Sequence, residues 1–175
     1  MKPLWTSRWT AAVALVLSLV AVGIAFEVRI EAGRGAHAWE TASTYAKVNE
    51  AKVAVTELAW GIAKCAEHEG KLPDTSAKVP ANLQAVHGMM YQAKLSDWDD
   101  AAFKCAGFHM IRPQRFQYQW VRRSPGEGTV VAASDFAGVG IAGQSVSLRV
   151  VCAPQGSALS CRPDPMSTEP TDFEL

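Results

Sequence analysis

The sequence has no net charge and few charged residues. Its 17 Lys and Arg are balanced by 17 Asp and Glu, and only 19% of the chain is charged. A domain that binds nucleic acid through phosphates is normally clearly basic, so this balance argues against that class. Hydrophobic residues make up 49% of the 175 residues, which is too apolar for a disordered chain. The length fits one ordinary domain plus a short segment.

Charge is missing altogether from Trp9 to Phe26, a run of 18 residues rich in Ala, Val and Leu. As a helix this run would span about 27 Å, close to the hydrocarbon core of a bilayer at roughly 30 Å. Lys2 and Arg8 precede it, and leading positive charge favours an N-terminus inside the cell. We therefore expect a cytoplasmic N-terminus over 1–8 and a single transmembrane helix over 9–26, with the rest outside the cytoplasm.

A cleaved signal peptide is the alternative for the same segment. Its parts are a basic start, an apolar middle, and the small-x-small sequence Gly23-Ile24-Ala25 before Phe26. Under both interpretations the remainder of the chain is exported. They differ in whether the apolar segment is retained in the mature protein.

Proline is missing from Ala36 to Glu69, where the apolar residues follow a helical period. One stripe consists of Tyr45, Val48, Ala51, Val55, Leu58, Ile62 and Cys65. The opposite, solvated side carries Lys47, Glu50, Glu57 and Lys64. The pattern predicts an amphipathic helical extension over 27–69 that ends at Gly70 and covers a sheet with its apolar stripe.

The last third of the chain changes to a period of two, which is typical of half-buried strands. The expected strands carry the alternating residues Phe116, Tyr118 and Trp120, the segment Thr129–Ser134, and the alternating residues Val146, Leu148, Val150 and Cys152. A turn over Pro125–Gly128 joins the first two strands. The predicted fold class is α+β, with the long helix packed on a three- to four-stranded antiparallel sheet. The head domain would cover 70–162, followed by a flexible tail over 163–175.

Three acids gather at Asp97, Asp99 and Asp100, directly after Ser96. Ser with acids is a common helix start, so we interpret the group as the cap of a short helical turn that runs to Cys105. Calcium is the alternative, but three carboxylates without a glycine-containing loop are weak support for it.

The chain has four cysteines, an even number in a short sequence, and all of them follow the apolar run, which favours two disulfides over a metal site. Among the three possible pairings we choose Cys152–Cys161 and Cys65–Cys105. The first pair brackets eight residues that can turn back on themselves, and the second ties the helix end to the loop before the first strand.

The sequence contains no recognisable set of catalytic or metal-binding residues. Cys65 and His68 with His87 or His109 would make an incomplete zinc site, because structural zinc needs a second closely spaced pair. No Ser-His-Asp or Cys-His order differs from chance. We therefore expect no metal, no cofactor and no enzymatic activity. A deep pocket with convergent titratable groups would instead favour a periplasmic enzyme.

Four arginines, at positions 112, 115, 122 and 123, flank the aromatic residues of the first expected strand. They are a possible partner surface: Arg112, Arg115, Arg122 and Arg123. Basic residues interleaved with aromatics also suit single-stranded nucleic acid. Aromatics at period two are more often packed under a covering helix, so nucleic acid is not the partner we expect.

Five short motifs follow one another along the chain in a characteristic order. They are Gly70-Lys71-Leu72-Pro73, Ser96-Asp97-Trp98, Ala106-Gly107-Phe108, Phe116-Gln117-Tyr118 and the run from Ala132 to Gly140. Together with the apolar N-terminal helix, this order resembles the type IV pilins and pseudopilins of Gram-negative bacteria over residues 10–152. The resemblance implies a single-pass inner-membrane protein with a periplasmic or extracellular head and a disulfide closing its C-terminal region. It also implies partner subunits of the same kind, bound through the apolar helix, in a type IV pilus or type II secretion assembly.

The sequence departs from that family at two points. Family members are cut after a Gly before the apolar helix and carry an acid early in it, whereas here Gly23 is the first glycine and Glu27 the first acid. This chain therefore lacks the usual prepilin peptidase site, which fits a static membrane anchor. In the family's aspartate-glycine turn only Asp135 remains, because Ala137 and Val139 replace the later acids. We interpret Asp135 as a turn former beside Gly138 and Gly140, not as a calcium ligand.

Overall fold

The structure is a computed structural model that describes residues 46–135 and 144–164. The predicted transmembrane segment 9–26, the start of the extension over 27–45, the glycine turn and the tail from residue 165 lie outside those residues. Within the described ranges, no helix is both long and apolar enough to cross a membrane.

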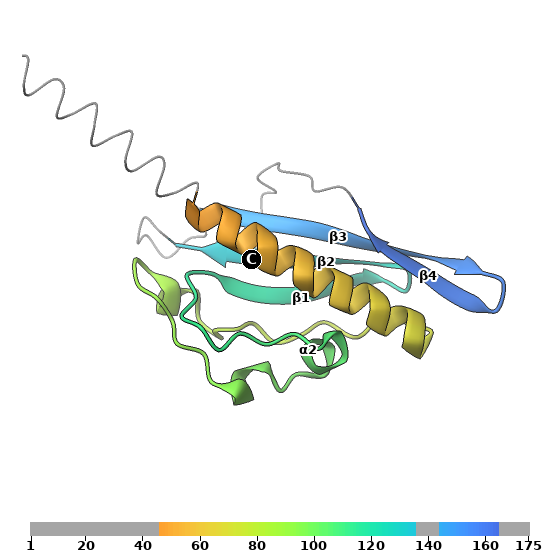
Figure 1. The fold of residues 1–175 in the computed structure, drawn as a ribbon, viewed down its shortest axis with the longest axis horizontal. Helices are drawn as coiled ribbons and strands as arrows, with labels where there is room; N and C mark the ends of the chain where they lie inside the picture. Colours follow the sequence, from red (N-terminus) through yellow and green to blue (C-terminus); the bar gives the residue numbers. More distant parts are fainter. Residues whose placement is uncertain (1–45, 136–143, 165–175) are drawn as a thin grey trace, which may run out of the picture. The chain divides into compact units, whose positions relative to one another are not determined.

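A four-stranded antiparallel sheet forms the base of the head (Figure 1). Its strands follow chain order: β1 (Gln117–Ser124), β2 (Glu127–Ser134), β3 (Gln144–Gln155) and β4 (Ala158–Pro163). The α+β class and the antiparallel sheet are confirmed. The strands are longer than the sequence predicted, since only Pro125 and Gly126 form the first turn.

The fourth strand lies where the sequence analysis expected a returning loop. Residues after Gly156, which has a φ of 63°, turn back so that Cys161 pairs directly with Cys152. The strand continues to Pro163, and the backbone amide of Asp164 donates to the Arg149 carbonyl at 2.8 Å. Residues 163 and 164, which the sequence analysis assigned to a flexible tail, are therefore held against β3.

The long helix over residues 46–69 packs across one face of the sheet (Figure 1). The predicted stripe is confirmed over most of its length: Ala51, Val55, Leu58, Ile62 and Cys65 are buried, and Val48 is half-buried. Except for Cys65, these side chains share one core with inward residues of the strands, among them Trp120, Val130 and Leu148. The helix ends at Glu69, where Gly70 takes a left-handed φ of 70° as predicted.

An aromatic cluster fills the space between β1 and the connection that precedes it. The Trp98 ring lies 5.1 Å from Phe103 and 5.3 Å from Phe108, both edge-to-face. The Trp98 indole N–H donates to the Met110 carbonyl at 3.2 Å, so its one polar group is satisfied. Trp98 and Phe108, two of the residues on which the family resemblance depends, are thus core residues of the head.

The predicted capping role of Asp97 and Asp100 is confirmed, but these residues serve two short helical elements where the sequence predicted a single turn. In η2 (Leu95–Trp98) the Asp97 carboxylate accepts from the Lys94 backbone amide at 2.9 Å. This bond, with the Tyr91 hydroxyl, holds the pKa of Asp97 below its usual value. In α2 (Ala101–Ala106) the Asp100 carboxylate accepts from the amides of Ala102 and Ala77, both at 2.9 Å. Ser96, which we expected to begin the turn, is not a cap.

The segment 75–80 covers the open edge of β1. The Ser76 amide donates to the Trp120 carbonyl at 2.9 Å, and Val79 exchanges two backbone hydrogen bonds with Tyr118. On the opposite edge, the Glu67 carboxylate accepts from the Cys161 amide at 2.9 Å. Both edge strands therefore have backbone groups bonded within the head, which blunts edge-to-edge association.

Gly61 lies where the long helix packs closely against α2. A Cβ at this position would lie 2.3 Å from the Ala106 carbonyl oxygen. Glycine normally weakens a helix interior by about 1 kcal/mol relative to alanine, so Gly61→Ala would stabilise an isolated helix. Here the overlap with backbone outweighs that gain, and we expect Gly61→Ala to lower the stability of the head by about 1–3 kcal/mol. Chemical denaturation measures the change. Lys64→Ala, at an exposed position of the same helix, should stay within about 0.5 kcal/mol of wild type, and a more stable Gly61→Ala would contradict the close packing.

Candidate functional site

The four arginines of the predicted partner surface fall at the two ends of β1. Arg112 and Arg115 precede the strand, whereas Arg122 and Arg123 lie near its end. Seven residues of extended chain, from Arg115 to Arg122, span about 23 Å. The described structure therefore places them as two separate pairs.

Two of these arginines form ion pairs inside the head. The Arg115 guanidinium lies 3.2 Å from the Glu50 carboxylate of the long helix, and Arg122 lies 2.8 Å from Asp74. Glu50 was assigned to the solvated side of the helix, which was wrong: its side chain is only 24% exposed, because Arg115 draws it against the sheet. Arg112 and Arg123 are exposed.

The aromatic residues of β1 and its approach are buried. Phe116, Tyr118 and Trp120 are at most 1% exposed, and the Trp120 indole N–H donates to the Pro73 carbonyl at 3.0 Å. Burial, with a smaller contribution from the Glu50 carboxylate, raises the pKa of Tyr118 well above its usual value. Bases stack only on accessible rings. The described rings between the two pairs of arginines therefore offer no stacking platform, which favours the packing interpretation.

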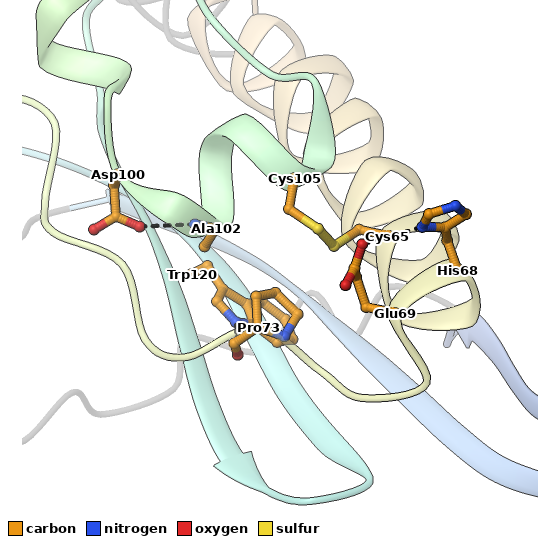
Figure 2. Close-up of a disulfide and its surroundings, with 8 residues drawn as sticks. All are labelled: Cys65, His68, Glu69, Pro73, Asp100, Ala102, Cys105 and Trp120. Carbon is orange, nitrogen blue, oxygen red and sulfur yellow. Dashed lines mark hydrogen bonds and ion pairs between the residues drawn. A yellow bond between two sulfur atoms is a disulfide. The ribbon is translucent and has the colours of Figure 1, made fainter.

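The predicted disulfides are both present. Figure 2 shows Cys65, near the end of the long helix, joined to Cys105 of α2, with Cα atoms 5.5 Å apart. Cys152 and Cys161 bridge β3 and β4 at a Cα distance of 4.1 Å. That distance suits two directly opposed residues of an antiparallel pair. The disulfides are consistent with export to an oxidising compartment.

His68 and His87 each lie beside a carboxylate. His68 lies at the same helix end as Cys65 (Figure 2), but that sulfur is bonded to Cys105, and the His68 ring pairs with Glu69 at 3.1 Å. His87 pairs instead with the buried Asp135 carboxylate at 3.3 Å. Among residues 46–135 and 144–164, no three His, Cys, Asp or Glu side chains gather with metal-binding geometry. Asp135, predicted as a turn former, is fully buried at the end of β2.

The outer face of the long helix is partly apolar, which the sequence analysis missed. Val53 and Trp60 are 63% and 50% exposed and lie seven residues apart, on one side of the helix. A shallow depression on the helix surface is lined by Lys52, Val53, Thr56 and Glu57. All four lining residues come from one helix, whereas catalytic sites usually draw groups from several elements. This face therefore suits contact with another surface better than chemistry on a small molecule.

A second exposed apolar set lies on the connection before β1. It consists of Met89, Met90, Leu95 and Ile111. In the sequence these residues appear only as short apolar pairs inside a turn-rich stretch, a pattern that does not by itself indicate exposure.

Comparisons with protein-family models, curated proteins and solved structures gave no match to this chain.

Proposed function

We propose that this protein is a non-enzymatic, pilin-like protein, anchored in the inner membrane by residues 9–26 with its head outside the cytoplasm. As a minor pilin or pseudopilin it would act through association with other pilin-like subunits, in a type IV pilus or type II secretion assembly. The observation that carries the proposal is the long helix packed on an antiparallel sheet whose last hairpin is closed by a disulfide. That arrangement agrees with the order of elements implied by the pilin resemblance.

The charge distribution supports the membrane anchor. The 18 residues from Trp9 to Phe26 contain no charge, and Lys2 and Arg8 lie on the leading side. Both disulfides in the head support the export of that domain.

The outer face of the long helix supports association. Val53 and Trp60, spaced by seven residues, follow the spacing that helices use in side-by-side contacts. The neighbouring occupant we assign to this face is the helix of a second pilin-like subunit, which would continue the contact made by the apolar segment.

A charge in the middle of the apolar segment tests the anchor. The full chain is expressed in a Gram-negative host, and its membranes are washed with alkaline carbonate. Wild type should stay in the washed membranes. Leu17→Arg should lose about 90% or more of that retention, since arginine at the centre of a membrane helix costs roughly 2.5–3.5 kcal/mol. Leu17→Ala, the matched control, should be retained.

Equal release of wild type and Leu17→Arg by carbonate would contradict the anchor. It would favour the second interpretation, an exported soluble binding domain with a cleaved signal and no role in a filament.

A further inference from the structure

The outer side of the long helix carries a continuous line of side chains. Steps of four, three and four separate Asn49, Val53, Thr56 and Trp60, which is the spacing that keeps side chains on one line of a helix. Three of them are exposed, and Thr56 is half-buried. The next residue at this spacing, Ala63, is 1% exposed, so the line ends at Trp60. We call Asn49, Val53, Thr56 and Trp60 the outer seam.

The depression on this side of the helix has the form of a packing groove. Its four lining residues make two rows in which side chains are four positions apart, Lys52 with Thr56 and Val53 with Glu57. Helices pack by placing the side-chain ridges of one in the grooves between such rows of the other. The outer seam is therefore shaped to receive another helix.

The polar members of the outer seam suit a covered contact. The Thr56 hydroxyl donates to the Lys52 carbonyl at 2.8 Å, so covering Thr56 leaves no unpaired donor. The Asn49 amide can both donate and accept, and two such amides can bind one another. A single asparagine in a helix seam fixes the register of the two helices.

Opposite charges flank the outer seam. Lys52 lies on one flank and Glu57 on the other, each about 70° around the helix from the middle of the seam. Neither forms an ion pair with another side chain in residues 46–135 and 144–164. Within the described part of the chain, both charges are therefore available to a partner.

We propose that the outer seam pairs with the outer seam of a second copy of this chain, with the two helices parallel and in register. This inference rests on the proposed function, because two chains anchored in one bilayer by residues 9–26 run away from it in the same direction. In a parallel pair, residues five apart on opposite flanks meet. Lys52 then lies beside Glu57 of the second chain, and two-fold symmetry repeats this contact on the other flank.

Charge selects this arrangement over the alternatives. An antiparallel pair would put lysine beside lysine on one flank and glutamate beside glutamate on the other, which disfavours it. A different subunit would have to supply its own acid and base at the matching positions. Two copies of this chain already carry both halves of the contact.

Cysteine crosslinking in membranes tests the pair. The full chain is expressed in a Gram-negative host, and washed membranes are treated with a short bismaleimide. All four native cysteines are in disulfides, so only an introduced thiol reacts. Val53→Cys should give crosslinked dimer, because the two copies of a seam residue face each other across the two-fold axis. Lys104→Cys, 61% exposed on α2 and outside the outer seam, should give about five-fold less or lower.

Charge reversal tests the contact between Lys52 and Glu57. In the Val53→Cys chain, either Lys52→Glu or Glu57→Lys alone puts like charges on both flanks, and the yield of dimer should fall about three-fold or more. Both substitutions together exchange the two partners and should restore the yield. Lys64→Glu, an exposed reversal beyond the end of the outer seam, should leave the yield unchanged.

Four results would overturn the inference. Absence of dimer from membrane-bound Val53→Cys would leave the outer seam unpaired. Equal yields from Val53→Cys and Lys104→Cys would mean random collision. Single reversals that the double reversal does not rescue would exclude the charge contact, and a crosslink to a different protein would assign the seam to another subunit. Carbonate separates the two proposals: chain that is released contradicts the proposed function, whereas chain that is retained without crosslinking contradicts only the pair.

Discussion

Leu58→Asp is expected to unfold the head at room temperature. Leu58 is fully buried, midway along the long helix, where its side chain belongs to the core shared with the sheet. A carboxylate at this position would lose its water without gaining a partner, and it would also leave a cavity. We expect a loss of about 4 kcal/mol or more in the free energy of unfolding, which approaches the whole stability of many domains. Circular dichroism and thermal denaturation give the measurement.

Val53→Asp is the matched control for that substitution. It introduces the same side chain on the same helix, five residues earlier, at a position that is 63% exposed. The free energy of unfolding should change by no more than about 0.5 kcal/mol. If Leu58→Asp melted at the wild-type temperature, the helix would not cover the sheet and the architecture would be wrong.

The two disulfides should contribute unequally to stability. Cys65–Cys105 closes a loop with a sequence separation of 40, whereas Cys152–Cys161 closes one of 9. On the loop-entropy model, removing the first as Cys65→Ala with Cys105→Ala costs about 4 kcal/mol. Removing the second as Cys152→Ala with Cys161→Ala costs about 2.7 kcal/mol. Denaturant titration of both double variants checks the order.

The second hairpin has support that is independent of its disulfide. Six backbone pairs join β3 and β4, and Glu67 also binds the Cys161 amide. By contrast, α2 has only six residues, and Cys105 is its covalent link to the long helix. A greater loss from the Cys152 and Cys161 variant than from the Cys65 and Cys105 variant would contradict this assignment of roles. Peptide mapping without reduction should recover the same two pairs.

Most of the architecture was readable from periodicity. The stripe through Leu58 and Ile62 recurs every three or four residues, and the alternation through Tyr118 and Trp120 has a period of two. These signals are local, so they survive without knowledge of the fold. The fourth strand was missed as a strand because residues 153–160 are mostly small and exposed, and they lack the alternating apolar pattern. Its pairing depends on the turn at Gly156 and the bond to Cys152, which are tertiary features.

The partner surfaces were less predictable. Arg115 looked like a free surface cation, but its ion pair with Glu50 joins residues 65 positions apart. Exposure of Trp60 could be suspected, since it lies off the buried stripe of its helix. Exposure of Met89 and Met90 could not, because the connection before β1 has no period from which an inner and an outer face can be assigned.

The measurement that bears most directly on the anchored, pilin-like protein is the intact mass and N-terminal sequence of the chain recovered from carbonate-washed native membranes. We expect the uncut chain of 18.8 kDa, with the segment from Trp9 to Phe26 retained as a permanent anchor. A mature N-terminus near Trp9 would indicate a processed pilin subunit in place of a static anchor. A chain that begins at Phe26 and is found in the soluble fraction would contradict the anchor, and with it the assembly through the apolar segment.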